Sequence, residues 1–243
     1  LDVAAVAAVL LDADPARSSA VADACGWSRS DWCRVVVFLV ALHDLGKFSR
    51  AFQAKSESAW PKAALGPYRV APADPHDAVG MQLAREPAVW DALAAPFAEW
   101  DPAEVALLLQ AVTGHHGRPA AADGGRLRAN VACGVCTQAA SAFVEEITPI
   151  LSPPALDVAQ ATPRALALAS WWLAGLTVLC DWLGSAQRWF PYRGDRPLVS
   201  LEAYWQEEAL PQARRAVAAS GLLACPVSAP RGVAALRPEL AAP

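Results

Sequence analysis

Apolar residues recur along most of the chain at the spacing of a helix, whereas the strict alternation of a half-buried strand is nearly absent. Ser, Asp or Pro opens several of these segments, as expected for helix caps and first turns. The Val-Val-Val-Phe-Leu-Val core at 35–40 also fits a buried strand, but its length and the serine cap before it favour a helix. We predict an all-α fold with helices near residues 1–11, 15–25, 31–44, 48–54, 76–93, 102–113, 129–146, 163–183 and 201–220.

Three stretches lack the helical spacing of apolar residues. Residues 56–75 are a loop rich in Pro and Gly, and residues 117–130 are a Gly-rich loop that carries three arginines. Residues 221–243 are rich in Pro and Ala and contain no predicted element. We expect one domain over residues 1–220, truncated at its N-terminus because the chain starts with Leu1 rather than Met, and a tail or linker over residues 221–243.

The most apolar stretch, residues 165–180, carries no charge and leads directly into Asp181. It is shorter than the roughly twenty residues that cross a bilayer, so we predict a central helix buried on all sides and no membrane span. Hydrophobic residues make up 55% of the chain and charged residues 18%, which excludes wholesale disorder. The formal net charge is −4, so any contact with nucleic acid would depend on a local basic surface.

The six cysteines mostly lie in apolar helical segments and are too few for a disulfide framework. We interpret them as thiols in or near the core of a cytoplasmic protein. Cys133 and Cys136 form a C-x-x-C pair, but a structural zinc site needs two further Cys or His ligands at short spacing, and the sequence offers none.

All four histidines of the chain adjoin Asp, Gly or another His. His43 and Asp44 close an apolar helix, where neighbouring side chains are about 100° apart and can reach one cavity beyond the helix end. A buried carboxylate needs a cation or several hydrogen-bond donors. A single His-Asp pair at a helix end is more typical of a hydrogen bond there than of a metal site.

The other histidines change this interpretation. His115 and His116 lie between Gly114 and Gly117, which leave the backbone free to turn both imidazoles toward one point. Asp181 ends the most apolar helix, and His76 begins another. Together with His43 and Asp44 they form one set of imidazole and carboxylate ligands, which favours manganese, iron, cobalt, nickel or zinc over magnesium or calcium.

Four motifs carry a resemblance to a known family. They are His-Asp-Leu-Gly-Lys-Phe-Ser-Arg-Ala-Phe-Gln at 43–53, His-Asp-Ala-Val-Gly at 76–80, Gly-His-His-Gly at 114–117 and Leu-Ala-Gly-Leu-Thr-Val-Leu-Cys-Asp-Trp-Leu-Gly-Ser at 173–185. The Lys-Phe-x-x-x-Phe-Gln extension, the double His and the Asp-Trp-x-Gly-Ser ending make the match specific. The chain resembles, over about residues 1–220, the HD nuclease domain of the CRISPR-associated type I nuclease-helicase.

The resemblance implies an HD-superfamily helical bundle around a di-metal site, which holds two divalent transition-metal ions (iron, manganese, cobalt or nickel). It implies a metal-dependent nuclease that hydrolyses the phosphodiester bonds of single-stranded DNA in type I CRISPR interference, an antiviral defence. Asp44 would bridge the metals and Lys47 would lie beside the scissile phosphate, with Ser185 at the edge of the site. The remaining ligands would be His43 and Asp181 for one ion, and His76, His115 and His116 for the other.

The implied partners are single-stranded DNA, the RNA-guided type I surveillance complex, and a helicase domain in the same chain or a separate one. We expect DNA contacts from Arg50, Arg118, Arg126, Arg128 and Arg188. Family members carry one more His just ahead of the stretch at which this chain begins, so we expect the site of His43 and Asp181 to be incomplete here. No G-x-x-x-x-G-K-[ST] motif occurs, so P-loop ATP hydrolysis is not expected of this chain.

Two other functions fit the same residues. An HD phosphohydrolase that acts on a nucleotide would enclose its substrate in a pocket, whereas a nuclease needs an open groove. A non-catalytic HD docking module would keep the scaffold without the activity.

Overall fold

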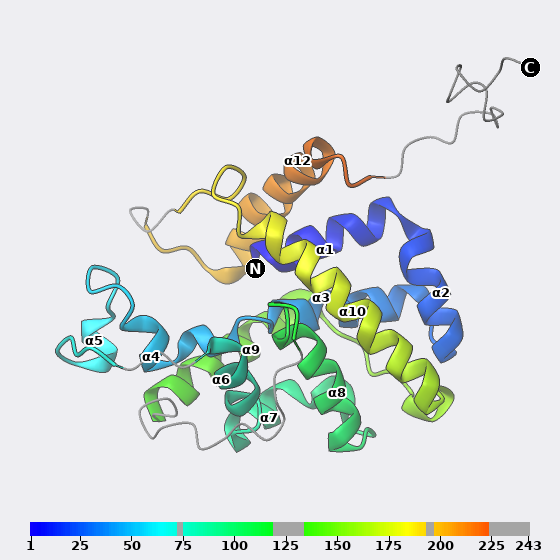
Figure 1. The fold of residues 1–243 in the computed structure, drawn as a ribbon, viewed down its shortest axis with the longest axis horizontal. Helices are drawn as coiled ribbons and strands as arrows, with labels where there is room; N and C mark the ends of the chain where they lie inside the picture. Colours follow the sequence, from blue (N-terminus) through cyan, green and yellow to red (C-terminus); the bar gives the residue numbers. More distant parts are fainter. Residues whose placement is uncertain (72–74, 119–133, 193–196, 224–243) are drawn as a thin grey trace, which may run out of the picture.

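The computed structural model describes residues 1–71, 75–118, 134–192 and 197–223, and these ranges contain helices and no strand, as predicted (Figure 1). The longer helices are α1 (Asp2–Ala13), α2 (Pro15–Cys25), α3 (Arg29–Ala41), α6 (His76–Leu83), α7 (Pro87–Leu93), α8 (Pro102–Thr113), α9 (Gly134–Leu151), α10 (Pro163–Gly184) and α12 (Leu210–Ser220). The short elements are η1 (Leu45–Phe48), α4 (Arg50–Gln53), α5 (Lys62–Leu65), η2 (Ala95–Phe97), η3 (Val158–Gln160), α11 (Leu201–Ala203) and the π-helical turn η4 (Tyr204–Ala209).

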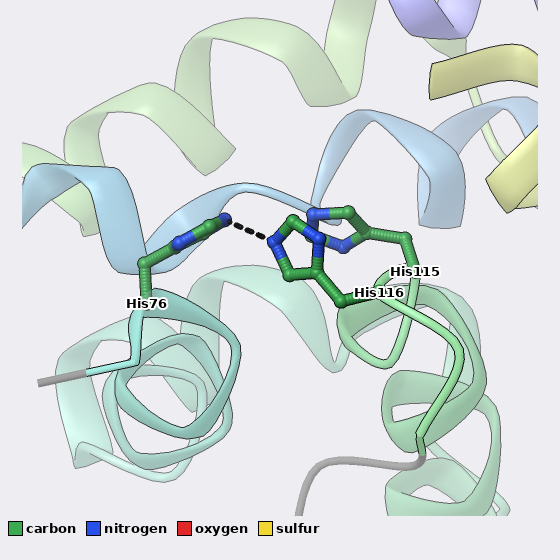
Figure 2. A group of neighbouring side chains, drawn as sticks. All are labelled: His76, His115 and His116. Atoms are coloured by element: carbon green, nitrogen blue, oxygen red, sulfur yellow. Dashed lines mark hydrogen bonds between the residues drawn. The ribbon is translucent and has the colours of Figure 1, made fainter. Parts of the chain in front are cut away.

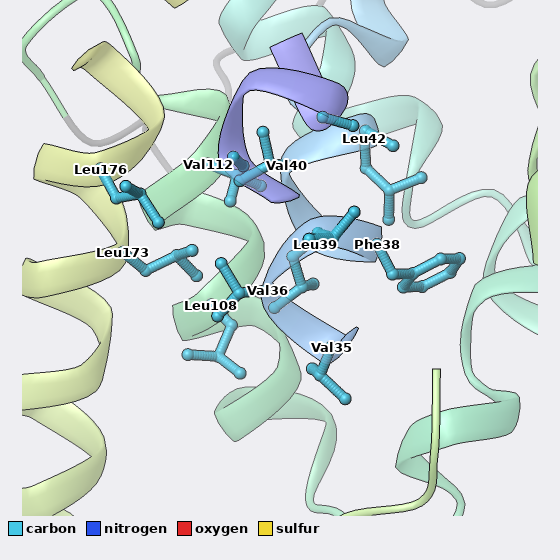
Figure 3. Close-up of a cluster of buried hydrophobic side chains, with 14 of the residues drawn as sticks. Val35, Val36, Phe38, Leu39, Val40, Leu42, Leu108, Val112, Leu173 and Leu176 are labelled. Atoms are coloured by element: carbon cyan, nitrogen blue, oxygen red, sulfur yellow. The ribbon is translucent and has the colours of Figure 1, made fainter. Parts of the chain in front are cut away.

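Helix α3 forms the centre of the hydrophobic core. The side chains of Val36, Phe38 and Leu39 are completely buried, and α8 and α10 contribute Leu108 and Leu173 to the same cluster (Figure 3). Helix α1 packs on α3, α10 and α12, so the N-terminus lies in the middle of the molecule beside the end of α10 (Figure 1). Apolar faces from distant parts of the sequence therefore meet around one helix.

The structure ends α3 at Ala41, three residues before the predicted end at 44. The amide of His43 donates to the carbonyl of Val40, a bond of the tighter 3₁₀ type, and Asp44 precedes the 3₁₀ turn η1. The prediction that this helix carries His43 and Asp44 within its last turn is therefore wrong. Both residues lie just beyond the helix, in a turn that directs them out of the core.

The predicted helix over 76–93 is two helices, because Pro87 begins α7 and residues 84–86 form the connection. The first of the two, α6, packs directly on η1. A Cβ atom added at Gly46 would overlap the carbonyl oxygen of His76, and one added at Gly80 would lie 3.1 Å from the amide nitrogen of Gly46. The absence of side chains at these two glycines therefore lets His76 approach Asp44.

Helix α10 is buried on one side only, so the prediction that it is surrounded on all sides is wrong. Trp171 and Trp182 on its outer face are each 75% exposed, and Leu168 is 52% exposed. It is the one helix in the described residues that is long and apolar enough to cross a membrane by length and composition. Its inner face packs against α1 and α8, where Gly184 touches the backbone of Val3.

The cysteines differ from the expectation of free thiols at one position. Cys25 and Cys180 are buried free thiols and Cys33 is a partly exposed one. Cys136, which is buried at the start of α9, is in a disulfide bond. The interpretation of Cys136 as a thiol is therefore wrong for this structure.

We predict that Gly46→Ala lowers the free energy of unfolding by about 3 kcal/mol, because α6 must move to accommodate the added methyl group. Urea unfolding followed by circular dichroism measures this. Gly175→Ala is the matched control: Gly175 is exposed within α10 and a Cβ there meets nothing within 4 Å. It should raise the stability by about 0.5–1 kcal/mol, as Ala does over Gly within a helix. Equal stabilities of the two variants would contradict the close approach of η1 and α6.

Candidate metal centre

Four helix ends meet at one place. The turn after α3, the start of α6, the turn after α8 and the end of α10 bring together the six ligands predicted from the sequence: His43, Asp44, His76, His115, His116 and Asp181. In Figure 2 the imidazoles of His76, His115 and His116 point toward one another from two different elements. The fold therefore gathers side chains that are up to 138 positions apart, from 43 to 181.

Two of the histidines have a defined tautomer. Nδ1 of His43 lies 2.7 Å from the carbonyl oxygen of Val40, and Nδ1 of His115 lies 3.2 Å from that of Val112. A carbonyl oxygen only accepts, so Nδ1 carries the proton in both rings. In the neutral imidazole, Nε2 is then left with a free lone pair, the arrangement found in metal-binding histidines.

Asp44 is the centre of the cluster. Its Oδ2 lies 3.0 Å from Nε2 of His43 and 2.5 Å from Nζ of Lys47. Its Oδ1 lies 3.2 Å from Nε2 of His76 and 3.7 Å from Nε2 of His115. The two carboxylate oxygens therefore face different histidines.

His116 and Asp181 also lie close to polar atoms of the cluster. Nε2 of His116 lies 3.1 Å from Nε2 of His76, so one of these two nitrogens carries a proton (Figure 2). Oδ1 of Asp181 lies 3.7 Å from Nε2 of His43 and accepts a hydrogen bond of 2.6 Å from the hydroxyl of Ser185. Ser185 is exposed, which places it at the edge of the cluster, as the sequence predicts.

The residues fit a divalent transition-metal ion. Nε2 of His43 and Oδ1 of Asp44 are buried and have no hydrogen-bond partner, although each has polar atoms close by. Two groups of donors, His76 with His115 and His116, and His43 with Asp44 and His115, each lie within 4.8 Å of one another. The polar atoms nearest to both are those of other candidate ligands, and a cation would satisfy both atoms at once in place of these crowded contacts.

The pKa shifts follow from this crowding. Burial by itself raises the pKa of Asp44, but the imidazoles of His43 and His76 and the ammonium of Lys47 outweigh it and hold the pKa well below its ordinary value. Burial would lower the pKa of His43, but the carboxylates of Asp181 and Asp44 raise it above the ordinary value. For His115, burial and the nearby His43 lower the pKa.

The pKa of the Asp181 carboxyl group is also lowered, as it is for Asp44. Burial raises the pKa of its carboxyl group, but His43 and the hydroxyl of Ser185 have the larger combined effect and lower it. The metal-free centre is therefore a set of ionised carboxylates that holds a proton on His43. A bound metal would displace that proton, because imidazole binds metals in its neutral form.

Of the arginines predicted to contact DNA, the three that lie in the described residues form no hydrogen bond or ion pair with the six candidate ligands. Arg50 donates to the carbonyl of Leu65 at 3.4 Å and its guanidinium lies 5.9 Å from the Trp60 ring. Arg188 is exposed and lies over the ring of its neighbour Trp189 at 4.5 Å. Arg118 is exposed just after the double His. Arg126 and Arg128 lie outside the described residues.

Two features of the centre have no counterpart in the predicted ligand set. Leu1 and Asp2 line the same cavity, of about 290 Å³, as His43, Asp44 and Lys47. The ring of Phe52 packs edge-on against His76, with centroids 5.4 Å apart. The Lys-Phe-x-x-x-Phe-Gln motif contained the signal for Phe52, but the spacing alone gave no role for it.

The chain matches known proteins along most of its length. The family described as "Cas3, HD domain" matches residues 1–190. The CRISPR-associated endonuclease/helicase Cas3 of Escherichia coli (strain K12) is 29% identical over 220 residues, which are 77% of this chain and 23% of that protein. This chain thus spans about a quarter of that relative.

Two solved structures are similar in fold. The crystal structure of a CRISPR-associated protein is 26% identical, with a TM-score of 0.73, over 98% of this chain and 26% of that one. The Thermus thermophilus Cas3 HD domain, crystallised in the presence of Ni²⁺, is 27% identical, with a TM-score of 0.60, over 90% of this chain and 82% of that one. Both matches agree with the helical HD architecture predicted from the sequence.

We predict that His43 stabilises the metal-free protein at pH 6.5 and that this contribution is lost as the pH rises further. The raised pKa of His43 means that its contribution is fully present below the unfolded-state pKa and is lost as the pH passes through the folded-state pKa. The carboxylates, whose pKa values are lowered, lose their contribution only in acid, below about pH 4. Urea unfolding in a chelator between pH 6.5 and 9 tests this.

The control is His43→Gln under the same conditions. The difference between the two proteins isolates His43, because other titrating groups are common to both. We expect the difference in unfolding free energy to shrink with rising pH by up to about 1.4 kcal/mol per pH unit. A difference that grows with pH would show that the folded protein holds His43 neutral.

Proposed function

Because the chain belongs to the Cas3 HD domain family, we propose that it is a metal-dependent nuclease that hydrolyses phosphodiester bonds in single-stranded DNA. The observation that carries the proposal is the environment of Asp44. One carboxylate, held ionised in a buried position, has a different imidazole nitrogen beside each of its oxygens. This is the arrangement that a carboxylate bridging two cations requires.

In the proposed centre Asp44 would be the ligand shared by two divalent transition-metal ions, which would be iron, manganese, cobalt or nickel. Two overlapping groups of donors support the proposal of more than one ion: His43, Asp44 and His115 form one, and His76, His115 and His116 form the other. The other ligands are assigned as in the family resemblance: His43 and Asp181 for one ion, and His76, His115 and His116 for the other. When bound, such ions would hold a phosphate, lower the pKa of a water molecule and stabilise charge on the departing oxygen.

The protein side chains orient the reacting groups. The carbonyls of Val40 and Val112 fix the rings of His43 and His115, so that Nε2 of each faces Asp44. Ser185 holds Asp181 by its hydrogen bond. Lys47, whose side chain is 39% exposed, balances the charge of Asp44 and is the cation best placed to contact the scissile phosphate.

The openness of the centre favours a polymer over a free nucleotide. His116, Ser185 and much of Lys47 are accessible from outside, whereas a nucleotide enzyme would enclose base and sugar. An HD phosphohydrolase acting on nucleotides, or a docking module without activity, is therefore the second choice. The proposal includes a cytoplasmic location and a place in type I CRISPR interference, with the RNA-guided surveillance complex and a helicase domain in cis or in trans as partners.

The resemblance also places one more histidine ahead of Leu1. Leu1 lines the cavity that contains His43 and Asp44, so a residue joined to it would lie at the edge of the centre. We therefore propose that a preceding residue completes the ligands around His43 and Asp181. Activity assays should include both this chain and a version extended at the N-terminus.

We predict that this protein degrades circular single-stranded DNA when Mn²⁺, Co²⁺, Ni²⁺ or Fe²⁺ is present, because each of these ions suits imidazole and carboxylate ligands. Gel electrophoresis of the circular strand measures cleavage, and a parallel panel of free and cyclic nucleotides is analysed by chromatography. Turnover of nucleotides with intact DNA would establish the phosphohydrolase instead. Failure of both substrates in the extended, metal-loaded protein would establish the docking module.

We predict that Asp44→Ala lowers cleavage of single-stranded DNA at least about a hundredfold, the loss that even the outer partners of metal ligands can cause. Circular dichroism should show an unchanged helix content, because Asp44 lies outside the core helices. Asp77→Ala is the matched control, since Asp77 also follows a histidine but, among the described residues, its carboxylate accepts only from the amide of Ala78. Equal rates in the two variants would rule out the bridging role.

A further inference from the structure

We propose that Lys55, held against the ring of Phe52, binds the backbone phosphate next to the one that is cut, and so forms a second phosphate site beside the metal centre. This inference rests on the proposed function, because it assumes that a nucleic-acid strand is the substrate. It concerns two residues to which the ligand set gives no role.

Phe52 lies at the rim of the centre in a fixed position. Its amide donates to the hydroxyl of Ser49, the cap of α4, at 3.2 Å. The side chain of Gln53 donates to the carbonyl of Lys47 at 2.7 Å, which ties α4 back to η1. The Phe52 ring then packs edge-on against His76. The Phe-Gln pair of the sequence motif therefore joins this rim to a metal ligand.

Two ammonium groups lie over the same ring. Nζ of Lys55 is 4.4 Å from the centroid of Phe52 and Nζ of Lys47 is 5.5 Å from it. The ring face attracts both cations through its quadrupole. The amide of Lys55 also donates to the carbonyl of Phe52, so backbone and side chain together keep Lys55 beside the ring.

The charges of the two lysines are not equally available. Lys47 forms an ion pair with Asp44, but Lys55 has no ion pair with any carboxylate in the described part of the chain. Lys55 is exposed and lies on the same rim as Lys47. Because the protein carries a formal net charge of −4, an unpaired cation fixed beside the centre is where a phosphate would be attracted locally.

A nucleic-acid strand contains neighbouring phosphate groups, whereas a single phosphate ester does not. With one phosphate at the metal centre beside Lys47, the next phosphate along the backbone would lie on the rim, where Lys55 is held. Sequence-independent binding of single strands uses such a row of cations along the backbone. The pair Phe52 and Lys55 would thereby help to distinguish a polynucleotide from a mononucleotide.

The test compares Lys55→Gln with Lys62→Gln. Lys62 is the third and last lysine of the chain; it is exposed at the start of α5, and it makes no contact with Phe52 among the described residues, so its substitution removes the same charge elsewhere. Binding of a fluorescein-labelled oligothymidine is measured by anisotropy in a chelator, at several salt concentrations. This readout needs neither metal nor cleavage, so it is independent of the catalytic part of the proposed function.

We expect Lys55→Gln to weaken binding about fivefold at 0.1 M salt and to reduce the slope of log K against log salt by about 0.7, the value for one phosphate contact with a single strand. Lys62→Gln should match the wild type. Equal effects of the two substitutions, or no binding by the wild type, would overturn the second phosphate site.

A kinetic comparison separates a phosphate contact from damage to the centre. In the metal-loaded protein, Lys55→Gln should raise KM for the oligonucleotide several-fold more than for bis(p-nitrophenyl) phosphate, which has no neighbouring phosphate. An equal loss of kcat on both substrates would mean that Lys55 acts through Phe52 on His76, and would also overturn the inference. If the wild type binds DNA but cleaves neither substrate, the proposed function fails while the binding result still decides the role of Lys55.

Discussion

The candidate metal centre depends on one electrostatic constraint, which is the partial burial of the Asp44 carboxylate at the end of the hydrophobic core. A carboxylate in this place stays ionised only if cations or donors surround it. The surrounding groups are the imidazoles of His43, His76 and His115 and the ammonium of Lys47. They come from separate elements, so one carboxylate links the turns after α3 and α8 to the start of α6, while the hydrophobic core holds the helices themselves.

Glycines allow these elements to come close enough. Gly46 and Gly80 let α6 approach η1, and Gly184 lets the end of α10 approach Val3 in α1. The second contact holds the end of α10, and with it Asp181, beside the N-terminal end of α1. Packing and chemistry are therefore coupled: a methyl group added at one of these glycines would move a candidate ligand. Where nothing crowds the helix, as at Gly175, this coupling is absent.

The sequence predicted the helices and the gathering of the six His and Asp side chains better than it predicted the junctions between helices. Asp101 and Pro102 give α8 a capping box and a first-turn proline, and both of its ends were predicted correctly. The early end of α3 was not predicted, because the apolar pattern continues through Leu42 and only tertiary contacts turn the chain there. The exposed face of α10 was not predicted either, because in the sequence Trp171 and Trp182 resemble core residues.

Electrostatic attraction also determines where the lysine and arginine side chains lie. In a chain with more acidic than basic residues, exposed lysines and arginines would be expected to pair with carboxylates. Two exposed cations instead lie against aromatic rings, Lys55 on Phe52 and Arg188 on Trp189, and so does the half-buried Arg50 on Trp60. A ring attracts a cation without neutralising it, so the positive charge stays available to a phosphate. Attraction of a strand to this protein would therefore depend on where a few cations are held rather than on the net charge.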